Sequence, residues 1–99
     1  MLEKDIERQL REGVILLGGL CLKLVCPGFT GVPDRMVIMP GGRICFVELK
    51  RPGKVERQRQ LFVQAKLRRM GCKVFSAVDS ALKVNGVLDW CREGREDGI

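Results

Sequence analysis

The sequence predicts an α/β fold in which helices flank a mixed β-sheet. Two observations support this prediction: an apolar stripe at helical spacing near the start of the chain, and short apolar runs of strand length separated by turns that contain glycine and proline. The predicted order is a helix, three strands, a helix, a strand and a last helix. A chain of 99 residues has room for one hydrophobic core, so we expect a single domain over residues 1–99.

The first helix is predicted from Glu3 to Leu17, because apolar side chains recur along one stripe of its surface. The stripe consists of Ile6, Leu10, Val14 and Leu17. Gly18 and Gly19 end the helix. Ile15 and Leu16 fall off the stripe, so we expect them to be covered either by the C-terminal helix or by a second copy of the chain.

A strand, a loop and a β-hairpin follow the first helix. Residues 20–25 alternate along the chain as a strand does, and they are predicted as the first strand. Residues 26–31 form a loop whose glycines can let a phosphate group approach the backbone, although a plain turn is equally consistent. The arms of the hairpin are residues 36–39 and 43–50, and the turn Pro40-Gly41-Gly42 joins them.

The second half of the chain alternates between helix and strand. Val55 to Met70 is predicted as a helix that stops at Gly71. Residues 72–78 form a further strand, and residues 81–92 form the last helix. The polar end, residues 94–99, is expected to be frayed.

The hairpin brings charged side chains together. Side chains alternate between the two faces of a strand, so Glu48 and Lys50 point to one side and Leu49 to the other. Antiparallel pairing then places Asp34, at the start of the first arm, beside them. Two carboxylates among apolar residues are costly unless a divalent cation neutralises them. A hard cation with oxygen ligands is therefore expected, and Mg²⁺ suits this ligand set best.

The charge of the chain favours a polyanionic partner. Lys and Arg outnumber Asp and Glu by 18 to 12, and many of the basic residues follow Lys50. Phosphate backbones bind to such surfaces. Taken alone, the charge is better explained as a solvated helix face. Next to a predicted Mg²⁺ site, which can also bind a phosphate group, we instead interpret it as a nucleic-acid-binding surface.

Histidine and cysteine usage excludes several mechanisms. The chain has no histidine, which rules out Ser-His and Cys-His nucleophiles and a histidine general base. Its five cysteines have no C-x-x-C spacing, so we expect reduced thiols and no structural zinc. No apolar run reaches the roughly 20 residues that span a bilayer, and the first five residues lack a signal-peptide core. We therefore expect a cytoplasmic protein without a membrane partner.

The charged residues of the hairpin carry a family resemblance. Pro33-Asp34, followed after thirteen residues by Glu48-Leu49-Lys50, resembles the PD-(D/E)xK signature of the restriction-endonuclease-like nucleases. The longer runs 27–34 and 46–54, with Gln60 ten residues after the lysine, resemble the VRR-NUC branch, the virus-type replication-repair nuclease domain. The likeness extends from Glu3 to about Trp90. It implies a restriction-endonuclease-like core with the order αβββαβ and an additional C-terminal helix.

The resemblance also implies roles for individual residues. The catalytic candidates are Glu7, Asp34, Glu48, Lys50 and Gln60. The candidate ligands of a Mg²⁺ or Mn²⁺ ion are Asp34, Glu48, the main-chain carbonyl of Leu49, and Glu7. Glu3 is the second choice for the first-helix acid, and its plain alternative is an acid that favours the helix dipole. The alternative for Lys50 is a salt bridge to Glu48 or Asp34. The role of Gln60 depends on the resemblance.

The resemblance implies DNA as the substrate, with branched DNA such as four-way junctions as a plausible target. The candidate DNA-contacting residues are Lys23, Arg35, Arg51, Lys54, Arg57 and Arg59. It further implies a homodimer that acts in DNA repair or replication in a bacterial or virus-infected cell. Three alternatives stay open: a basic nucleic-acid-binding module without catalysis, an inactive nuclease-fold interaction subunit, and a hydrolase of small phosphoesters. The last is the least favoured, because no Gly-rich nucleotide loop is present.

Overall fold

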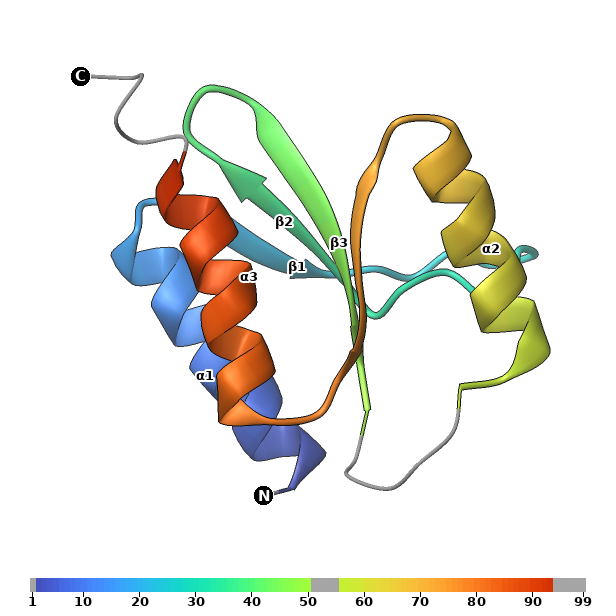
Figure 1. Ribbon diagram of the computed structural model, residues 1–99, viewed down its shortest axis with the longest axis horizontal. Helices are drawn as coiled ribbons and strands as arrows, with labels where there is room; N and C mark the ends of the chain where they lie inside the picture. The colour runs from blue at the N-terminus through green and yellow to red at the C-terminus, as the bar shows by residue number, and fades with distance from the viewer. Residues whose placement is uncertain (1, 51–55, 94–99) are drawn as a thin grey trace.

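Three helices cover the two faces of a four-stranded sheet (Figure 1). The computed structural model describes residues 2–50 and 56–93. Helices α1 (Glu3–Leu16) and α3 (Ala81–Glu93) pack side by side on one face. Helix α2 (Gln58–Arg69) lies on the other face. This arrangement confirms the predicted α/β class and the predicted order of elements.

The sheet is mixed, as predicted, and its strands are arranged in chain order. The strands are β1 (Leu20–Lys23), β2 (Arg35–Met39), β3 (Arg43–Leu49) and β4 (Lys73–Val78). The pairs β1–β2 and β2–β3 are antiparallel, and the second pair is the predicted hairpin. The pair β3–β4 is parallel, which requires the crossover that α2 provides.

Two element boundaries differ from the sequence prediction by more than one residue. Strand β1 ends at Lys23 rather than at Val25. Helix α2 begins at Gln58, because Arg57 has an extended backbone (φ −75°, ψ 152°) and occupies the N-cap position. The predicted start of this helix, Val55, lies outside the described residues.

The hydrophobic core lies between the sheet and the pair α1 and α3. Three of the four residues of the predicted helical stripe, Ile6, Leu10 and Val14, are fully buried in it. The two helices approach closely at Gly13, where a Cβ atom would lie 2.6 Å from Cδ1 of Leu88. No helix in the described part of the chain is long and apolar enough to cross a bilayer.

The C-terminal helix does not cover the two aliphatic residues that fall off the stripe. Within the described residues, Ile15 is 54% exposed and Leu16 is 85% exposed. The first of the two sequence-based explanations for them is therefore wrong, since α3 packs against a different side of α1. The physical reason is that Gly13 has no side chain, so Leu88 of α3 can pack closely against that face of α1.

The face of the sheet on the α2 side is only partly covered. Its first three strands present two rows of cross-strand neighbours, because residues directly opposite one another share a face. The rows are Leu20, Ile38 and Ile44, and Leu22, Met36 and Phe46, and we call these six residues the open face. Leu20, Leu22 and Ile44 are between 40% and 56% exposed. Helix α2 buries Val63 and Gln64 and leaves apolar side chains such as Phe62 half exposed.

The five cysteines are free thiols. Burial raises the pKa of Cys45 to about 12 and the pKa values of Cys21 and Cys91 to about 11. At neutral pH these thiols are protonated and poorly nucleophilic, because the thiolate is the reactive form.

Gly31 fixes the approach of the loop before Asp34 to helix α2. Its φ of 89° lies in the left-handed region, and an added Cβ would lie 2.7 Å from Cγ and 3.0 Å from the carbonyl oxygen of Arg59. Gly28 has a similar φ of 81°, but no described atom lies within 4 Å of its Cβ position. The two glycines therefore have similar positive φ angles, but only Gly31 lies close to other atoms.

We expect Gly31→Ala to destabilise the protein more than Gly28→Ala. Both substitutions place an L side chain in the left-handed region, which costs roughly 1–2 kcal/mol. Only Gly31→Ala also forces the loop away from the backbone of Arg59. Urea unfolding of the two variants measures the difference, and an equal loss of unfolding free energy would contradict the proposed close contact.

Candidate active site

Asp34 is held at the end of the hairpin by the opposite strand. Its Oδ2 accepts a hydrogen bond of 2.8 Å from the backbone N–H of Leu49. Its backbone carbonyl accepts a further bond of 2.9 Å from the N–H of Leu24, which ties the loop before β2 to the end of β1. The carboxylate is thus placed beside the last residues of β3, as the antiparallel geometry requires.

Glu48 is a buried acid with one oxygen engaged and one oxygen without a partner. The residue is 1% exposed. Its Oε2 accepts a 2.6 Å hydrogen bond from Nε2 of Gln60 and lies 3.9 Å from Nζ of Lys50. Its Oε1 is buried and has no hydrogen-bond partner within the described parts of the chain. A buried oxygen without a hydrogen bond is unfavourable, and an ion or a water molecule could satisfy it.

The surroundings of Glu48 disfavour its ionised form. Burial, and to a lesser extent the negative charge of Asp34, raise the pKa of its carboxyl from 4.5 to about 7. The ammonium group of Lys50 acts in the opposite direction, and Glu56 adds to the increase. In the absence of a bound cation, the carboxyl is therefore partly protonated at neutral pH.

Gln60 connects the acid, the lysine and the helix. It is the third residue of α2, and its Oε1 accepts a 2.9 Å bond from the backbone N–H of Arg57 at the N-cap position. The same oxygen accepts a 3.1 Å bond from Nζ of Lys50, while Nε2 donates to Glu48. The start of the helix therefore determines where the amide lies, and the amide holds both charged groups.

The donor set suits a hard divalent cation. Asp34 supplies a carboxylate, Glu48 supplies its unpartnered Oε1, and the carbonyl of Leu49 lies on the same strand end. All three are oxygen donors, which Mg²⁺ and Mn²⁺ prefer. Within residues 2–50 and 56–93, no group of three or more acidic or cysteine side chains could hold a metal ion. The remaining ligands would thus be main-chain oxygen, water and phosphate, which is usual for Mg²⁺.

The chain is similar to a protein that is named a nuclease and to a solved structure of a named domain. No protein-family model matches the chain. A protein of Acyrthosiphon pisum secondary endosymbiont phage 1, named "Putative nuclease p44", is 44% identical over 72 residues, which cover 73% of this chain and 77% of that protein. A solved structure named "VRR_NUC domain" superposes with a TM-score of 0.81 at 33% identity and covers 88% of this chain and 94% of the other.

The chain belongs to the VRR-NUC family. Its three helices and four-stranded mixed sheet form the restriction-endonuclease-like fold that the sequence predicts.

The first-helix acid of this VRR-NUC chain lies apart from the two carboxylates described above. Oε1 of Glu7 accepts a 3.2 Å hydrogen bond from Nε of Arg11 and lies 3.6 Å from Nη2 of Arg35. The contacts of Glu7 in the described structure are therefore with arginines rather than with Asp34 and Glu48. Glu3 is exposed in the first turn of α1. The metal-binding role of Glu7 stays a prediction.

The candidate DNA-contacting residues are placed in different ways. Lys23 and Arg57 are exposed. Arg59 is also exposed, but it donates to the carbonyl of Thr30 and its guanidinium lies 4.9 Å from the ring centre of Phe29. Arg35 is half-buried and engaged with Glu7.

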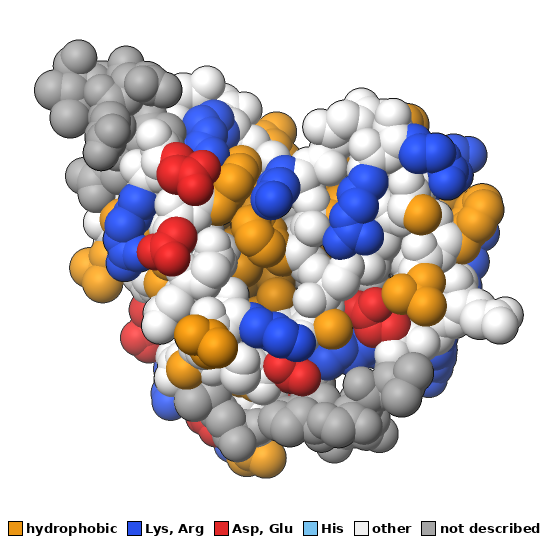
Figure 2. Space-filling view, in the orientation of Figure 1, with side chains coloured by type: hydrophobic (Ala, Val, Ile, Leu, Met, Phe, Trp, Pro, Cys, Tyr) orange, Lys and Arg blue, Asp and Glu red, His pale blue; other side chains and the backbone are white. Residues whose placement is uncertain are grey.

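Two further candidates, Arg51 and Lys54, lie outside the described residues. Figure 2 shows Lys and Arg side chains on both sides of a groove between the two halves of the visible face.

Sequence reasoning missed a second group of polar residues next to the site. Gln64, which is 1% exposed, donates to Oε1 of Glu56 at 3.3 Å and accepts a hydrogen bond from the hydroxyl of Ser76. Arg68 also donates to Ser76, at 2.7 Å. The spacing of Gln60 and Gln64, four residues apart on one helix face, was the available signal.

We expect Glu48→Gln to remove a pH dependence from the stability of the metal-free protein. The pKa of Glu48 is higher in the folded than in the unfolded state, so the folded protein binds more protons between pH 4.5 and 7, and wild-type stability falls as pH rises through this range. The full shift corresponds to roughly 3 kcal/mol. The neutral amide of the Glu48→Gln variant does not ionise, so the stability of this variant does not fall in the same way as pH rises.

The measurement is chemical unfolding in EDTA at pH 5 and pH 8. Glu48→Gln should be more stable than the wild type at pH 8, with a smaller difference at pH 5. Glu12→Gln, which removes an exposed carboxylate from α1, serves as the control. Identical pH profiles for wild type and Glu48→Gln would contradict the unfavourable ionisation of Glu48.

Proposed function

We propose that this VRR-NUC chain is a Mg²⁺- or Mn²⁺-dependent DNA endonuclease that cleaves branched DNA, with four-way junctions as the expected target. Membership of the family makes the chain a nuclease, and therefore a phosphodiester hydrolase. The observation that carries the metal dependence is the buried, unpartnered Oε1 of Glu48, which lies on the same strand end that binds Asp34. A cation there would satisfy this oxygen and neutralise two neighbouring acids.

Each residue of the candidate site would have its own role in the reaction. Asp34, Glu48 and the carbonyl of Leu49 would hold the cation. When bound, the ion acidifies water and offsets the negative charge that develops on the phosphate oxygens. Lys50 would orient the attacking water or stabilise the charge of the transition state, with its ammonium group held by Gln60. Gln60 is hydrogen-bonded to both Lys50 and Glu48, so its role would be to hold the two side chains in a fixed relative position.

We further propose that the working unit is a homodimer. Cutting both strands of a symmetric junction needs two active sites related by a two-fold axis, and one chain supplies one. The open face supports this proposal, because six apolar side chains on adjacent strands form a patch without a charged residue among them. A two-fold interface brings the same patch of both copies together, and an uncharged apolar patch is complementary to itself.

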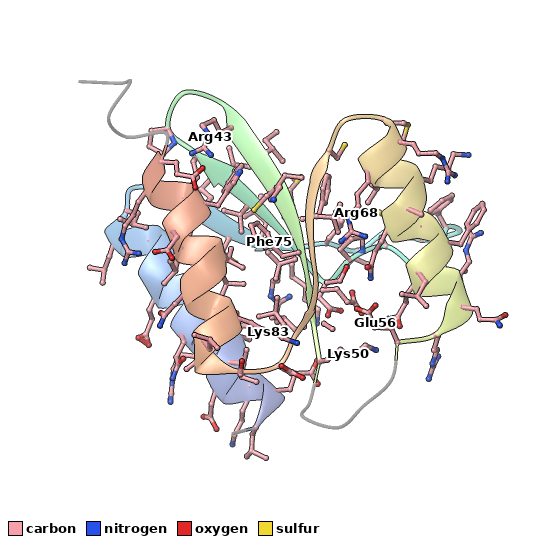
Figure 3. The ribbon with its side chains drawn as sticks, in the orientation of Figure 1. Arg43, Lys50, Glu56, Arg68, Phe75 and Lys83 are labelled. Carbon is pink, nitrogen blue, oxygen red and sulfur yellow. The ribbon has the colours of Figure 1, made fainter. Side chains whose placement is uncertain are left out.

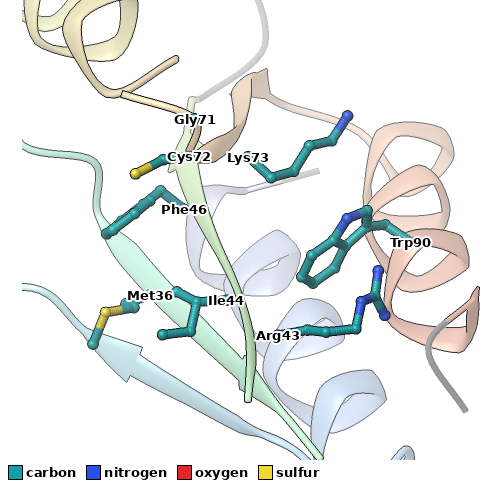
Figure 4. Close-up of a pocket in the computed structure, with 8 residues that line it drawn as sticks. All are labelled: Met36, Arg43, Ile44, Phe46, Gly71, Cys72, Lys73 and Trp90. Atoms are coloured by element: carbon teal, nitrogen blue, oxygen red, sulfur yellow. The ribbon is translucent and has the colours of Figure 1, made fainter. Parts of the chain in front are cut away.

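A cavity lies at the edge of the open face, so the surface there is concave. It has a volume of about 480 Å³ and includes three residues of the open face, Met36, Ile44 and Phe46 (Figure 4). Arg43 and Trp90 form part of its far wall, with the guanidinium 4.0 Å from the ring centre of the indole. A second copy could insert apolar side chains into this depression.

The proposed biological setting is the replication or repair of DNA in the cytoplasm of a bacterial or virus-infected cell. The phage origin of the relative that is 44% identical supports this setting.

We expect Asp34→Asn, Glu48→Gln and Lys50→Ala each to reduce cleavage of a four-way junction by about a hundredfold or more, because each removes a group that acts on the scissile phosphate. DNA binding should largely persist, since Lys and Arg side chains outside the site supply it. Cleavage of linear, nicked, flapped, forked and four-way DNA with Mn²⁺, compared with a binding assay, measures both effects.

Two results would contradict this proposal. Undiminished cleavage in excess EDTA would exclude metal dependence. A Lys50→Ala variant that retains most of the wild-type rate would exclude the role of Lys50. If the protein binds DNA but cleaves none of the substrates, the alternative of a non-catalytic binding module is favoured.

We expect Ile44→Lys to convert the dimer into a monomer, because a charge within an apolar two-fold interface is desolvated without a partner of opposite charge. Leu82→Lys is the matched control, since Leu82 is 81% exposed on α3 and is not part of the open face. Light scattering at micromolar concentration reports the mass. A wild-type mass of one chain, with junction cleavage intact and first order in protein, would rule the dimer out.

A further inference from the structure

Strand β4 carries one additional residue directly opposite Glu48. Val47 pairs with Phe75 and Leu49 pairs with Val78. Between these pairs, β3 has one residue, Glu48, whereas β4 has two, residues 76–77. The ladder then continues with a 2.9 Å bond from the N–H of Lys50 to the carbonyl of Val78. The irregularity is a β-bulge, and bulges beside active sites commonly redirect a side chain.

The bulge holds a residue in an unfavourable conformation. Ala77 has a φ of 51°, and it is the one non-glycine residue with positive φ in the described parts of the chain. A side chain in this region costs about 1–3 kcal/mol, and such a conformation persists only where surrounding contacts enforce it. The contacts that enforce the conformation of Ala77 are therefore of interest for the site.

Two charged side chains hold the backbone of Ala77. Its N–H donates a 2.8 Å hydrogen bond to Oε1 of Glu56, and its carbonyl accepts a 3.0 Å bond from Nζ of Lys83. Glu56 precedes helix α2, whereas Lys83 lies in α3 on the other side of the sheet. Figure 3 shows Glu56 near Lys50, in the space between the sheet and the start of α2.

The neighbouring residue of the bulge is held by α2. The hydroxyl of Ser76 donates to Oε1 of Gln64 and accepts a 2.7 Å bond from Nη2 of Arg68. Arg68 also donates to the carbonyl of Val74 at 3.0 Å. Gln64 completes the connection by donating to Oε1 of Glu56 at 3.3 Å. Glu56 thus accepts hydrogen bonds both from Ala77 and from Gln64, and Gln64 in turn holds Ser76.

Helix α2 therefore supports the site through two of its residues. Gln60 holds the side chains of Glu48 and Lys50, and Gln64, four residues later, supports the bulge opposite Glu48. A bulge that straightened would change the pairing of Leu49 and Lys50 with β4, and with it the direction of the side chains that follow.

We propose that Glu56 is a positioning residue of the nuclease, whose carboxylate holds the Ala77 peptide in its left-handed conformation and so fixes the strand end that carries Glu48, Leu49 and Lys50. This proposal rests on the proposed function of the site. In this proposal Glu56 acts through the backbone of β4 rather than through contact with the substrate. The competing explanation is a polar contact that only stabilises the packing of α2 on β4.

The test uses two single variants and a double variant that should restore activity. Glu56→Ala removes the acceptor for the N–H of Ala77 and should lower kcat on a four-way junction about tenfold, with KM for DNA nearly unchanged. Glu56→Gln keeps an oxygen acceptor and should retain most of kcat. In the double variant Glu56→Ala with Ala77→Gly, glycine adopts the positive φ without strain, so kcat should recover.

A matched control separates positioning from stability. Val84→Ala removes a buried side chain of α3, which is 2% exposed, and destabilises the core without touching the contacts of Glu56. Its kcat, measured well below its melting temperature, should remain close to the wild-type value. If Val84→Ala loses as much kcat as Glu56→Ala, or if Ala77→Gly fails to rescue, the proposal is overturned.

Hydrogen exchange provides a readout that needs neither DNA nor metal. The N–H of Leu49 is bonded to Asp34 and reports directly on the strand end. In Glu56→Ala, the amides of Ala77 and Leu49 should both exchange faster. In the double variant the amide of Leu49 should be protected again, whereas the amide of residue 77 still lacks its acceptor. Unchanged protection of Leu49 in Glu56→Ala overturns the positioning role, whereas the expected exchange pattern in a protein without nuclease activity would support it and refute the proposed function.

Discussion

A buried carboxylate is the constraint on which the arrangement of this VRR-NUC domain depends. Glu48 is almost fully removed from solvent on the third strand, where an apolar side chain would be more stable. The neighbouring groups offset part of this cost, because Gln60 and Lys50 both lie against Oε2. The other oxygen is left without a described partner. The domain thus gives up stability at the position that we propose binds a cation.

Much of this arrangement could be predicted from the sequence, because it follows from local rules. The alternation of side chains along a strand, together with the Pro-Gly-Gly turn, places Asp34 beside the end of β3 without any knowledge of the rest of the fold. The apolar stripe of α1 predicts the core positions Ile6, Leu10 and Val14. These features depend on residues that are near one another in the chain or that repeat with a fixed period.

The remaining features depend on contacts between distant segments, and the sequence contains little signal for them. The buried position of Gln64 is one example, since an amide on a helix is more often exposed, and its partners Glu56 and Ser76 lie on other elements. The bulge at Ala77 is another, because alanine has no preference for a positive φ. The two arginines around Glu7 are a third, and the stripe of α1 gives no indication of Arg35 on a strand.

Because the sheet has both antiparallel and parallel strand pairs, one part of the site forms earlier during folding than the other. The hairpin of β2 and β3 is formed by residues close in sequence, and hairpins close in microseconds. The parallel pairing of β4 with β3 must wait for the crossover through α2, which closes a longer loop. A partly folded chain would therefore hold both acids before it acquires the glutamine and the bulge that orient them. Local opening of α2 and β4 would likewise disable the nuclease while the hairpin stays intact.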